Sequence, residues 1–244
     1  MPSFALSPGL DPFALAEMYG RTRRLQISGF LRQDCVEALH AELAASKTWR
    51  LAANRGEQII DFTPEMLAGF KPEDWQKLHR AVALGGRYGF QFLYETIRLP
   101  KPGAEPAQPP PPLFAAFAYF MSSPEVVDLM RTITGDDAIA FANAHASRYS
   151  PGHFLTTHDD RIDEQGRRAA YVLNLTPEWR PDWGGLLLFF DGQGNVERGY
   201  TPGFNTLNIF AVPQPHNVTC VTPLAAAPRY AVTGWLRAHA GPAE

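Results

Sequence analysis

The hydrophobic positions of the chain follow a helical period in the first part and a strand period in the second. Apolar residues recur every three or four positions in 34–45, so this stretch is expected to form a helix, preceded by a short strand at 25–27. A second helical stretch is expected over 73–98, interrupted or kinked by the glycines inside it. A serine followed by a proline predicts the start of a third helix, at 123–134, which should end at Gly135.

Beyond Asp137 the pattern changes to short segments rich in β-branched and aromatic residues, separated by clusters of turn-forming residues. Many short strands with regular turns predict a sandwich or barrel, and helices that precede them predict a helical layer packed against it. We therefore expect an α+β fold with a mainly β core in a single domain over 1–244, with a helical support layer in 1–137 and the β core in 138–238. The expected strands are 138–149, 169–175, 185–190, 206–212, 218–221 and 230–237.

Residues 100–112 are rich in proline, which has no amide hydrogen to donate. This stretch cannot form a helix or a central strand. It is expected to be an extended loop that connects the flanking elements. A lid over a binding site and a ligand for a proline-binding module are the alternatives.

Composition and charge exclude several classes of protein. Hydrophobic residues make up 45% of the chain, enough for a full core, and the formal net charge of −3 offers no basic surface for nucleic acid. No apolar run is long enough to cross a bilayer, and the first residues lack the pattern of a signal peptide. Cys35 and Cys220 lie far apart and are expected to be buried thiols in a reducing compartment. We therefore expect a cytoplasmic protein without a nucleic-acid or membrane partner.

The candidate chemistry begins at His158 in the strand-rich part, where the sequence reads His-Asp-Asp. Side chains two positions apart on a strand point to the same side, so His158 and Asp160 can face one point while Asp159 points away. His216, beside prolines that end a strand, is the candidate third ligand. Two imidazoles and one carboxylate on one face of an ion leave positions open for a bidentate ligand and oxygen, which suits Fe(II). An exposed His-Asp pair without function is the alternative.

Two further residues point to an anionic ligand. Arg229 heads the last expected strand, and an arginine inside an apolar pocket needs an anionic partner. Its fork of donors suits a carboxylate, and a charge-assisted hydrogen bond contributes roughly 1.5–3 kcal/mol. Tyr149, upstream of the first histidine, could place its hydroxyl on the same carboxylate. A surface arginine and a core tyrosine are the alternatives.

These candidates belong to an ordered set of residues, namely Tyr149, Gly152, Leu155, His158, Asp160, Trp183, Gly184, Gly185, Leu187, His216, Arg229, Gly234 and Trp235. Each motif in the set is weak by itself, but their joint order is specific. The set resembles the prolyl hydroxylase branch of the 2-oxoglutarate- and Fe(II)-dependent oxygenases. The resemblance covers about residues 138–238.

The resemblance implies a double-stranded β-helix, a variant of the jelly roll, with supporting N-terminal helices and iron inside its open end. It implies that His158, Asp160 and His216 hold Fe(II), with 2-oxoglutarate as co-substrate, O₂ as oxidant and ascorbate as a supporting reductant. The implied reaction hydroxylates a substrate and converts 2-oxoglutarate to succinate and CO₂. Because only neutral imidazole binds a metal, two histidine ligands predict that iron binding weakens below about pH 6.

The resemblance also implies the residues around the co-substrate. Arg229, helped by Tyr149, would bind the C5 carboxylate of 2-oxoglutarate. Thr233, an even number of positions from Arg229 on the same strand, would add a hydroxyl contact. Many relatives have a tyrosine near the position of Asn174, so this departure leaves the contacts of the C1 carboxylate open.

The substrate implied by the resemblance is a prolyl residue of a protein or peptide. Arg167 and Arg168 stand where related enzymes have a substrate-contacting arginine, although solvated arginines after a turn are the alternative. Hydroxylation of a free amino acid or small metabolite is a second possible activity. A jelly-roll binding or sensor module, or a cupin-like site for another metal such as zinc in a hydrolase, are the remaining alternatives.

Overall fold

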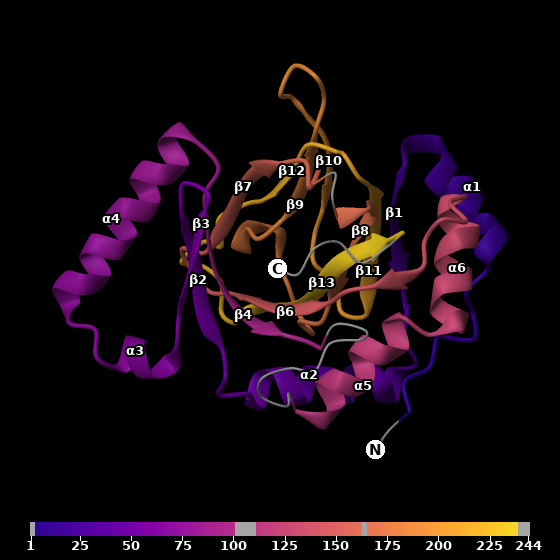
Figure 1. The fold of residues 1–244 in the computed structure, drawn as a ribbon, viewed down its shortest axis with the longest axis horizontal. Helices are drawn as coiled ribbons and strands as arrows, with labels where there is room; N and C mark the ends of the chain where they lie inside the picture. The colour runs from indigo at the N-terminus through magenta and orange to yellow at the C-terminus, as the bar shows by residue number, and fades with distance from the viewer. Residues whose placement is uncertain (1–2, 101–110, 163–164, 239–244) are drawn as a thin grey trace.

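The computed structural model of the chain describes residues 3–100, 111–162 and 165–238. At its centre, antiparallel strands curl into a nearly closed barrel (Figure 1). The strands are β1 (Arg24–Ser28), β2 (Arg50–Arg55), β3 (Gln58–Phe62), β4 (Phe92–Arg98), β5 (Phe141–Ala142), β6 (His145–Tyr149), β7 (Phe154–His158), β8 (Arg167–Asn174), β9 (Leu187–Phe190), β10 (Val196–Tyr200), β11 (Thr206–Ala211), β12 (His216–Val218) and β13 (Arg229–Arg237).

Helices lie on the outside of the barrel in three places (Figure 1). They are α1 (Pro12–Thr22), α2 (Gln33–Ala45), α3 (Pro64–Ala68), α4 (Pro72–Tyr88), α5 (Pro112–Met121) and α6 (Pro124–Thr134), and a short 3-10 helix spans Pro181–Trp183. In Figure 1, α1 and α6 lie side by side at the right, α2 and α5 lie below the barrel, and α3 and α4 extend to the left of β2 and β3.

The order of the strands brings distant parts of the sequence together. The main path of the sheet is β1-β11-β8-β13-β6-β4-β7-β12-β9-β10, while β2 pairs with β3 and β4, and β5 pairs with β13. The start of β4 pairs with β7 and its end pairs with β6, so β4 joins the two halves of the sheet. On its other edge β7 pairs with β12, although a long stretch of sequence separates these two strands.

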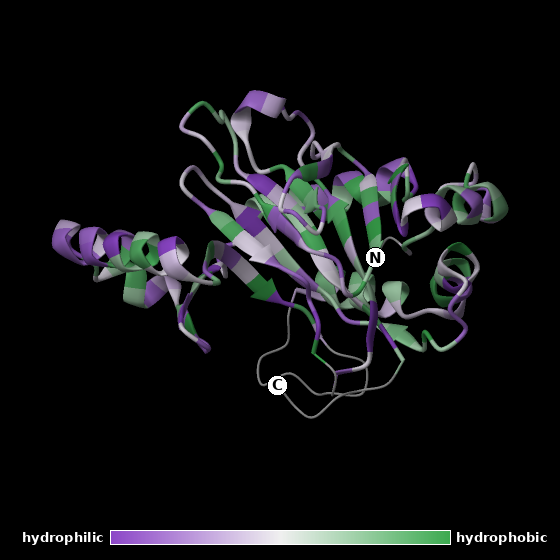
Figure 2. Cartoon of the chain, turned by 90° about the horizontal axis from the view of Figure 1, so that it is seen from above, coloured by the Kyte–Doolittle hydropathy of each residue, from purple (hydrophilic) through white to green (hydrophobic). Residues whose placement is uncertain are grey.

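The main core lies between the barrel and the helices that cover it. Leu39 of α2, Phe117 of α5, Met130 of α6 and Leu173 of β8 are fully buried members of this cluster. Burial of each such side chain contributes roughly 1.5–3 kcal/mol. Figure 2 shows hydrophobic residues along the barrel strands, whereas α4 at the left carries a mixed pattern. The helices therefore stabilise the barrel from outside and leave its interior to other side chains.

Two of the expected helices are confirmed. The helix expected over 34–45 is α2, and the one expected over 123–134 is α6. Ser123 caps α6 by accepting a hydrogen bond from the backbone nitrogen of Val126. The helix ends at Gly135, which takes a φ of 66°, a conformation that glycine adopts without strain.

The expected helix over 73–98 is wrong in its second half. Helix α4 ends at Tyr88, and 92–98 forms β4. This segment is rich in β-branched and aromatic residues, and its edges pair with β2, β6 and β7. Strands β2 and β3 were also not expected, and together with β1 and β4 they extend the sheet from the first part of the chain.

The strands expected in the second part are largely confirmed. Strands β6, β8, β9, β11 and β13 fall within or beside the expected segments, whereas the segment expected at 218–221 begins earlier, at His216 in β12. Strands β7 and β10 were missed. The proline-rich loop expected at 100–112 lies largely outside the described residues.

Two other expectations are changed by the structure. Cys35 is buried in α2, but Cys220 is exposed, so the expectation of two buried thiols is wrong for Cys220. Within the described ranges, no single helix has the length and apolar character needed to cross a bilayer. Helices α5 and α6, taken together as a bent pair, have the length and composition of a membrane span, but this is weak evidence for one. Many of their apolar residues lie in the core.

Candidate metal centre

Two histidines stand opposite each other on neighbouring strands. His158 is the last residue of β7 and His216 is the first residue of β12. The two strands pair antiparallel with these histidines in register, and the centroids of their rings lie 4.2 Å apart. The strand pairing therefore joins two residues that the sequence keeps far apart.

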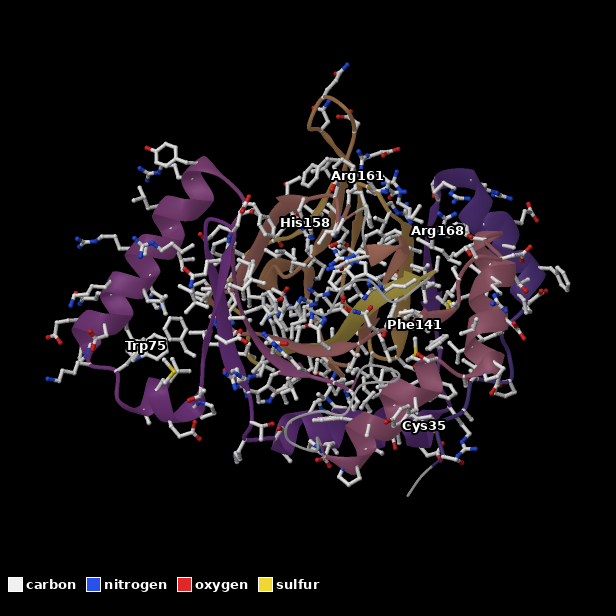
Figure 3. All side chains as sticks on the ribbon, viewed as in Figure 1. Cys35, Trp75, Phe141, His158, Arg161 and Arg168 are labelled. Atoms are coloured by element: carbon white, nitrogen blue, oxygen red, sulfur yellow. The ribbon has the colours of Figure 1, made fainter. Side chains whose placement is uncertain are left out.

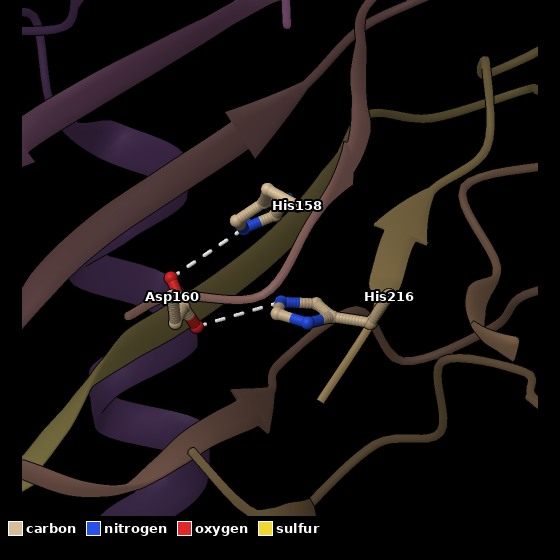
Figure 4. Close-up of side chains that lie close together, drawn as sticks. All are labelled: His158, Asp160 and His216. Carbon is tan, nitrogen blue, oxygen red and sulfur yellow. Dashed lines mark ion pairs between the residues drawn. The ribbon is translucent and has the colours of Figure 1, made fainter. Parts of the chain in front are cut away.

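Asp160 completes the group from the segment that follows β7 (Figure 4). Its Oδ1 lies 3.5 Å from Nε2 of His158, and its Oδ2 lies 3.5 Å from Nε2 of His216. Asp160 has a φ of 63°, in the left-handed region, which aspartate adopts more readily than most non-glycine residues. Asp160 does face the same point as His158, as expected, but the expected reason is wrong, because Asp160 lies beyond the end of the strand. A left-handed turn beyond the strand directs the carboxylate.

Backbone contacts determine which nitrogen of each imidazole faces the centre. Nδ1 of His158 lies 2.9 Å from the carbonyl oxygen of Thr156, and Nδ1 of His216 lies 2.8 Å from that of Gln214. A nitrogen next to a carbonyl oxygen carries the hydrogen and donates it, so the lone pair of the neutral ring is on Nε2. Both Nε2 atoms face Asp160 and are ready to bind a cation.

The donor set fits a divalent metal. One ligand atom from each of His158, Asp160 and His216 lies within 4.8 Å of the others. Two imidazole nitrogens and one carboxylate oxygen suit Fe(II) and leave coordination positions for other ligands. These three residues are the ones that would hold the ion.

The surroundings keep Asp160 and His216 in the protonation states that metal binding requires. Burial would raise the pKa of Asp160, but its contacts with His158, His216 and Arg167 outweigh this effect and lower the pKa to about 2. Burial is also the main reason that the pKa of His216 falls to about 4. At neutral pH the site therefore contains a carboxylate at Asp160 and a neutral imidazole at His216.

The lowered pKa of His216 predicts that acid destabilises the metal-free fold. A histidine in the unfolded chain binds a proton near pH 6.5, whereas His216 in the folded chain does so near pH 4. Between these values the unfolded state binds more protons. The contribution of His216 to the free energy of unfolding should thus be fully present above about pH 6.5. It should fall by about 1.4 kcal/mol per pH unit as the pH decreases toward 4.

Urea unfolding of the metal-free protein between about pH 7 and about pH 4.5 measures this slope. The variant His216→Gln should have a shallower slope, while burial of His40 and His153, whose pKa values are also lowered, contributes equally to both proteins. Equal slopes would contradict the buried, neutral state of His216. For the same reason, protons should compete with a metal at His216 only well below the pH 6 expected for an ordinary histidine.

The three ligands line a cavity of about 380 Å³ inside the barrel. Arg229, Tyr149 and Thr233, which the sequence associates with the co-substrate, line the same cavity. Figure 3 shows His158 in the upper part of the barrel, with Arg161 above it. The other lining residues are mainly apolar or aromatic, among them Phe92, Tyr94, Leu155, Val172, Leu187, Phe210 and Trp235. The cavity therefore combines a polar centre with largely apolar walls.

Arg229 is the charged residue of this cavity that most needs a ligand. Its side chain is only 2% exposed, and Nη2 donates to Oδ1 of Asn174 at 3.0 Å. Nε and Nη1 are buried and have no hydrogen-bond partner within the part of the chain that the structure describes. Burial lowers the pKa of Arg229 to about 10, so the group remains charged at neutral pH. Unpaired buried donors are costly, and a carboxylate in the cavity would satisfy them.

The other three residues around the co-substrate take different positions. Tyr149 presents the face of its ring to the guanidinium, with Cζ of Arg229 5.5 Å from the ring centroid. Asn174 is fully buried and is not among the residues that line the cavity; its Nδ2 donates to the carbonyl oxygen of Thr206, and it supports Arg229 from behind. Thr233 lies on the cavity wall. Direct contacts of these three residues with a co-substrate stay predictions.

Gly185 makes room for the arginine. It has a φ of 62°, and a Cβ atom there would lie 3.3 Å from Cδ of Arg229 and 3.2 Å from side-chain atoms of Trp179 and Val221. These distances are tight, and the left-handed conformation strains other residues. The glycine in the Trp-Gly-Gly motif therefore belongs to the construction of the site.

The two candidate substrate arginines separate in space. Arg167 lines the cavity, and its Nη1 lies 3.6 Å from Oδ1 of Asp160. Arg168 does not line the cavity; its Nε pairs with Oδ2 of Asp136 at 2.6 Å on the outside, toward α6 (Figure 3). Neither arrangement tests a contact with substrate.

Several residues of the cavity were not assigned a role from the sequence. Trp235 could have been found, because it lies on the same strand face as Arg229 and Thr233. Ile59 and Phe90 line the mouth of the cavity from the first part of the chain. No local signal indicates them, because only the pairing of β2, β3 and β4 with the barrel brings them there.

The fold and the site together define a class of protein: a jelly-roll domain with a two-histidine, one-carboxylate centre and a buried arginine in the same cavity. Residues 144–237, which contain the three ligands and Arg229, match the family model of the 2OG-Fe(II) oxygenase superfamily. Through these residues the chain resembles the 2OG-Fe(II) oxygenases, and among them the prolyl hydroxylases.

Curated relatives share part of the sequence. The chain is 30% identical over 105 residues to Prolyl 3-hydroxylase OGFOD1 of Xenopus laevis, a match over 41% of this chain and 18% of that protein. The corresponding protein of Mus musculus is 29% identical over 105 residues, or 17% of its length. The match thus spans less than a fifth of these relatives.

Solved structures share the fold over most of the chain. A prolyl-4-hydroxylase of Pseudomonas putida has a TM-score of 0.56 at 21% identity, over 93% of this chain and 98% of that one. An oxidoreductase of the 2OG-Fe(II) oxygenase family from Burkholderia pseudomallei has a TM-score of 0.63 at 13% identity, over 97% and 95%. A prolyl hydroxylase of Trichoplax adhaerens, in complex with a peptide fragment of the hypoxia inducible factor oxygen degradation domain, has a TM-score of 0.60 at 17% identity, over 91% and 87%.

Proposed function

We propose that this protein is an Fe(II)- and 2-oxoglutarate-dependent dioxygenase that hydroxylates a prolyl residue of a protein or peptide. One observation carries the proposal: a buried arginine with two unpaired donors lines the same cavity as the His158, Asp160 and His216 cluster. A metal site alone would suit many reactions. A metal site that shares its cavity with a buried carboxylate receptor is what a reaction with a 2-oxo acid requires.

Different residues of the cavity would bind the metal and the co-substrate. His158, Asp160 and His216 would hold Fe(II), and Arg229 would bind the C5 carboxylate of 2-oxoglutarate through Nε and Nη1. Bound iron would supply the oxidative chemistry with O₂, and ascorbate would serve as a supporting reductant. Asn174 keeps the guanidinium in place through the hydrogen bond from Nη2.

The walls of the cavity contribute by excluding water and orienting the ligands. Tyr94 and Tyr149 stack with ring centroids 5.1 Å apart beside Arg229, and the ring of Phe210 lies 4.6 Å from that of His216. In such a poorly solvated site the attraction between Arg229 and a carboxylate is stronger than in water. The aromatic walls also restrict the imidazole rings and so keep Nε2 directed at the centre.

A polypeptide substrate is supported by the mouth of the cavity and by the relatives. Ile59, Phe90 and Ile162 line the cavity and remain 60%, 47% and 40% exposed. Exposed apolar side chains at this rim of the cavity suit a chain segment that continues beyond the reacting residue, and they share the cavity with the charged residues Asp159 and Arg161. Relatives in sequence and fold carry names of prolyl hydroxylases, and one was solved with a peptide.

Anaerobic addition of Fe(II) and 2-oxoglutarate tests the class of activity. We expect a visible charge-transfer band that requires both additions, followed by succinate formation when air is admitted. Without such a band the protein would instead be a jelly-roll binding module or a site for a different metal. The measurement does not depend on knowledge of the substrate.

Mass spectrometry tests the substrate class. Prolyl peptides are expected to gain one oxygen atom in the presence of Fe(II) and 2-oxoglutarate, and free proline is expected to remain unchanged. Turnover of free proline without turnover of any prolyl peptide would rule out the polypeptide substrate and favour the small-metabolite activity.

The rim predicts a specific effect on peptide recognition. Phe90→Ala should raise the KM for a peptide substrate about 10-fold, because a partly exposed aromatic side chain contributes on the order of 1–2 kcal/mol when a ligand covers it. Tyr88→Ala is the matched control, since Tyr88 is 79% exposed and does not line the cavity. Steady-state kinetics with varied peptide measure both variants, and equal KM values for the two would contradict the role of the rim.

A further inference from the structure

Asp160 adopts its conformation without the support of a strand. It lies two residues beyond the end of β7 and takes a φ of 63°. Within the described ranges, the other non-glycine residues with positive φ are Arg23 and Asn205. Among residues other than glycine, asparagine and aspartate adopt this conformation most readily. Rotation out of it would move the carboxylate away from the two histidines. Contacts with the surroundings would therefore stabilise the conformation that faces the histidines.

Arg167 contacts Asp160 at both its backbone and its side chain. Nη1 of Arg167 donates to the carbonyl oxygen of Asp160 at 3.1 Å and lies 3.6 Å from Oδ1 of the carboxylate. Both side chains are 8% exposed. One guanidinium nitrogen thus ties the main chain of the ligand to its carboxylate, on the side of Oδ1 that also faces His158.

The position of Arg167 is itself determined by β13 and by the turn before β8. Its Cζ lies 3.6 Å from the centroid of the Trp235 ring, and its Nε donates to Oε1 of Gln165 at 2.9 Å. Nε of Arg237 donates in turn to the carbonyl oxygen of Gln165 at 2.7 Å. Trp235 and Arg237 belong to β13, which also carries Arg229. One strand therefore supports both the metal ligand and the arginine of the co-substrate site.

We propose that Arg167 is a positioning residue that holds Asp160 in its left-handed conformation and directs the carboxylate toward the two histidines. The proposal rests on the proposed function, because it takes His158, Asp160 and His216 as the metal ligands. It differs from the substrate contact expected from the sequence, since the contacts of Arg167 lead to a ligand. The positive charge of Arg167 opposes the binding of a cation, whereas its positioning effect favours it, so the two effects have opposite signs.

Titration of the metal-free protein with Co(II) separates the two effects. Arg167→Met should weaken Co(II) binding about 10- to 100-fold, the loss typical of residues that orient metal ligands. Arg167→Lys keeps the charge but lacks the planar fork, so it should also bind Co(II) more weakly than the unaltered protein. Arg168→Met is the matched control, because Arg168 pairs with Asp136 outside the cavity, and it should bind Co(II) like the unaltered protein. Tighter Co(II) binding by Arg167→Met would overturn the proposal.

The visible absorption of bound Co(II) provides a readout that a purely structural role would not move. Arg167→Met should change this spectrum, because the carboxylate ligand is displaced. An unchanged affinity and spectrum, with or without a lower thermal midpoint, would overturn the proposal and leave the proposed function standing. Absence of Co(II) binding by the unaltered protein would instead overturn the proposed function and the proposal with it. If Arg167→Met does not fold, Gln165→Ala removes the Nε contact and should weaken binding a few-fold, and unaltered binding would again overturn the proposal.

Discussion

Replacement of Asp160 by asparagine is expected to abolish iron binding and, with it, the iron-dependent formation of succinate. Asparagine tolerates the left-handed backbone at this position and has nearly the same volume, so the variant removes the negative charge and keeps the local fold. The loss of metal affinity should exceed about 100-fold, which is the upper end of what is lost when only a residue that supports a ligand is changed. Anaerobic titration with Fe(II), followed by measurement of succinate, tests both expectations.

The neighbouring carboxylate offers a matched control. Asp159 accepts a hydrogen bond from the backbone nitrogen of Arg161 at 3.0 Å and is not part of the ligand cluster. Asp159→Asn should therefore bind iron like the unaltered protein. If Asp160→Asn keeps its affinity for iron, or if both variants lose it equally, the assignment of the carboxylate ligand is wrong.

Replacement of Arg229 by methionine is expected to raise the concentration of 2-oxoglutarate needed for half-maximal turnover by a factor of roughly 10² to 10⁴. Two charge-assisted hydrogen bonds at roughly 1.5–3 kcal/mol each would be lost, and about 1.4 kcal/mol corresponds to a factor of ten. Metal binding should be retained, because Arg229 is not part of the ligand cluster.

The same variant should not destabilise the metal-free protein. Arg229 is buried with two unpaired donors, and replacement of an unsatisfied buried charge by an apolar side chain of similar length is neutral or stabilising. Addition of 2-oxoglutarate to the Mn(II)-bound protein should further raise the thermal midpoint of the unaltered protein and not that of Arg229→Met. Arg229→Lys keeps the charge but lacks the planar fork of donors, so the rise of its thermal midpoint should lie between those of the other two proteins. An unchanged requirement for 2-oxoglutarate would refute the role of Arg229.

The sequence determined the kinds of residue available for chemistry and the helices with clear local signals. Helix α6 could be predicted because its cap, its proline and its terminal glycine all lie within one short stretch. The ligands could be named because histidine, aspartate and arginine are unusual in apolar, strand-forming surroundings and occur here in a characteristic order. Such signals are local or ordered along the chain, so they survive without knowledge of the fold.

The tertiary structure alone decided how these residues meet. The segment 92–98 became β4 instead of a helical turn because partners in β2, β6 and β7 satisfy its backbone groups, and those partners are distant in sequence. The pairing of β7 with β12 set His158 against His216, and a left-handed turn, not strand alternation, directed Asp160. The support of Asp160 by Arg167 and the unpaired donors of Arg229 likewise arise from contacts across the barrel. Periodicity reports which face of an element is buried, but it carries no information about which other element covers that face.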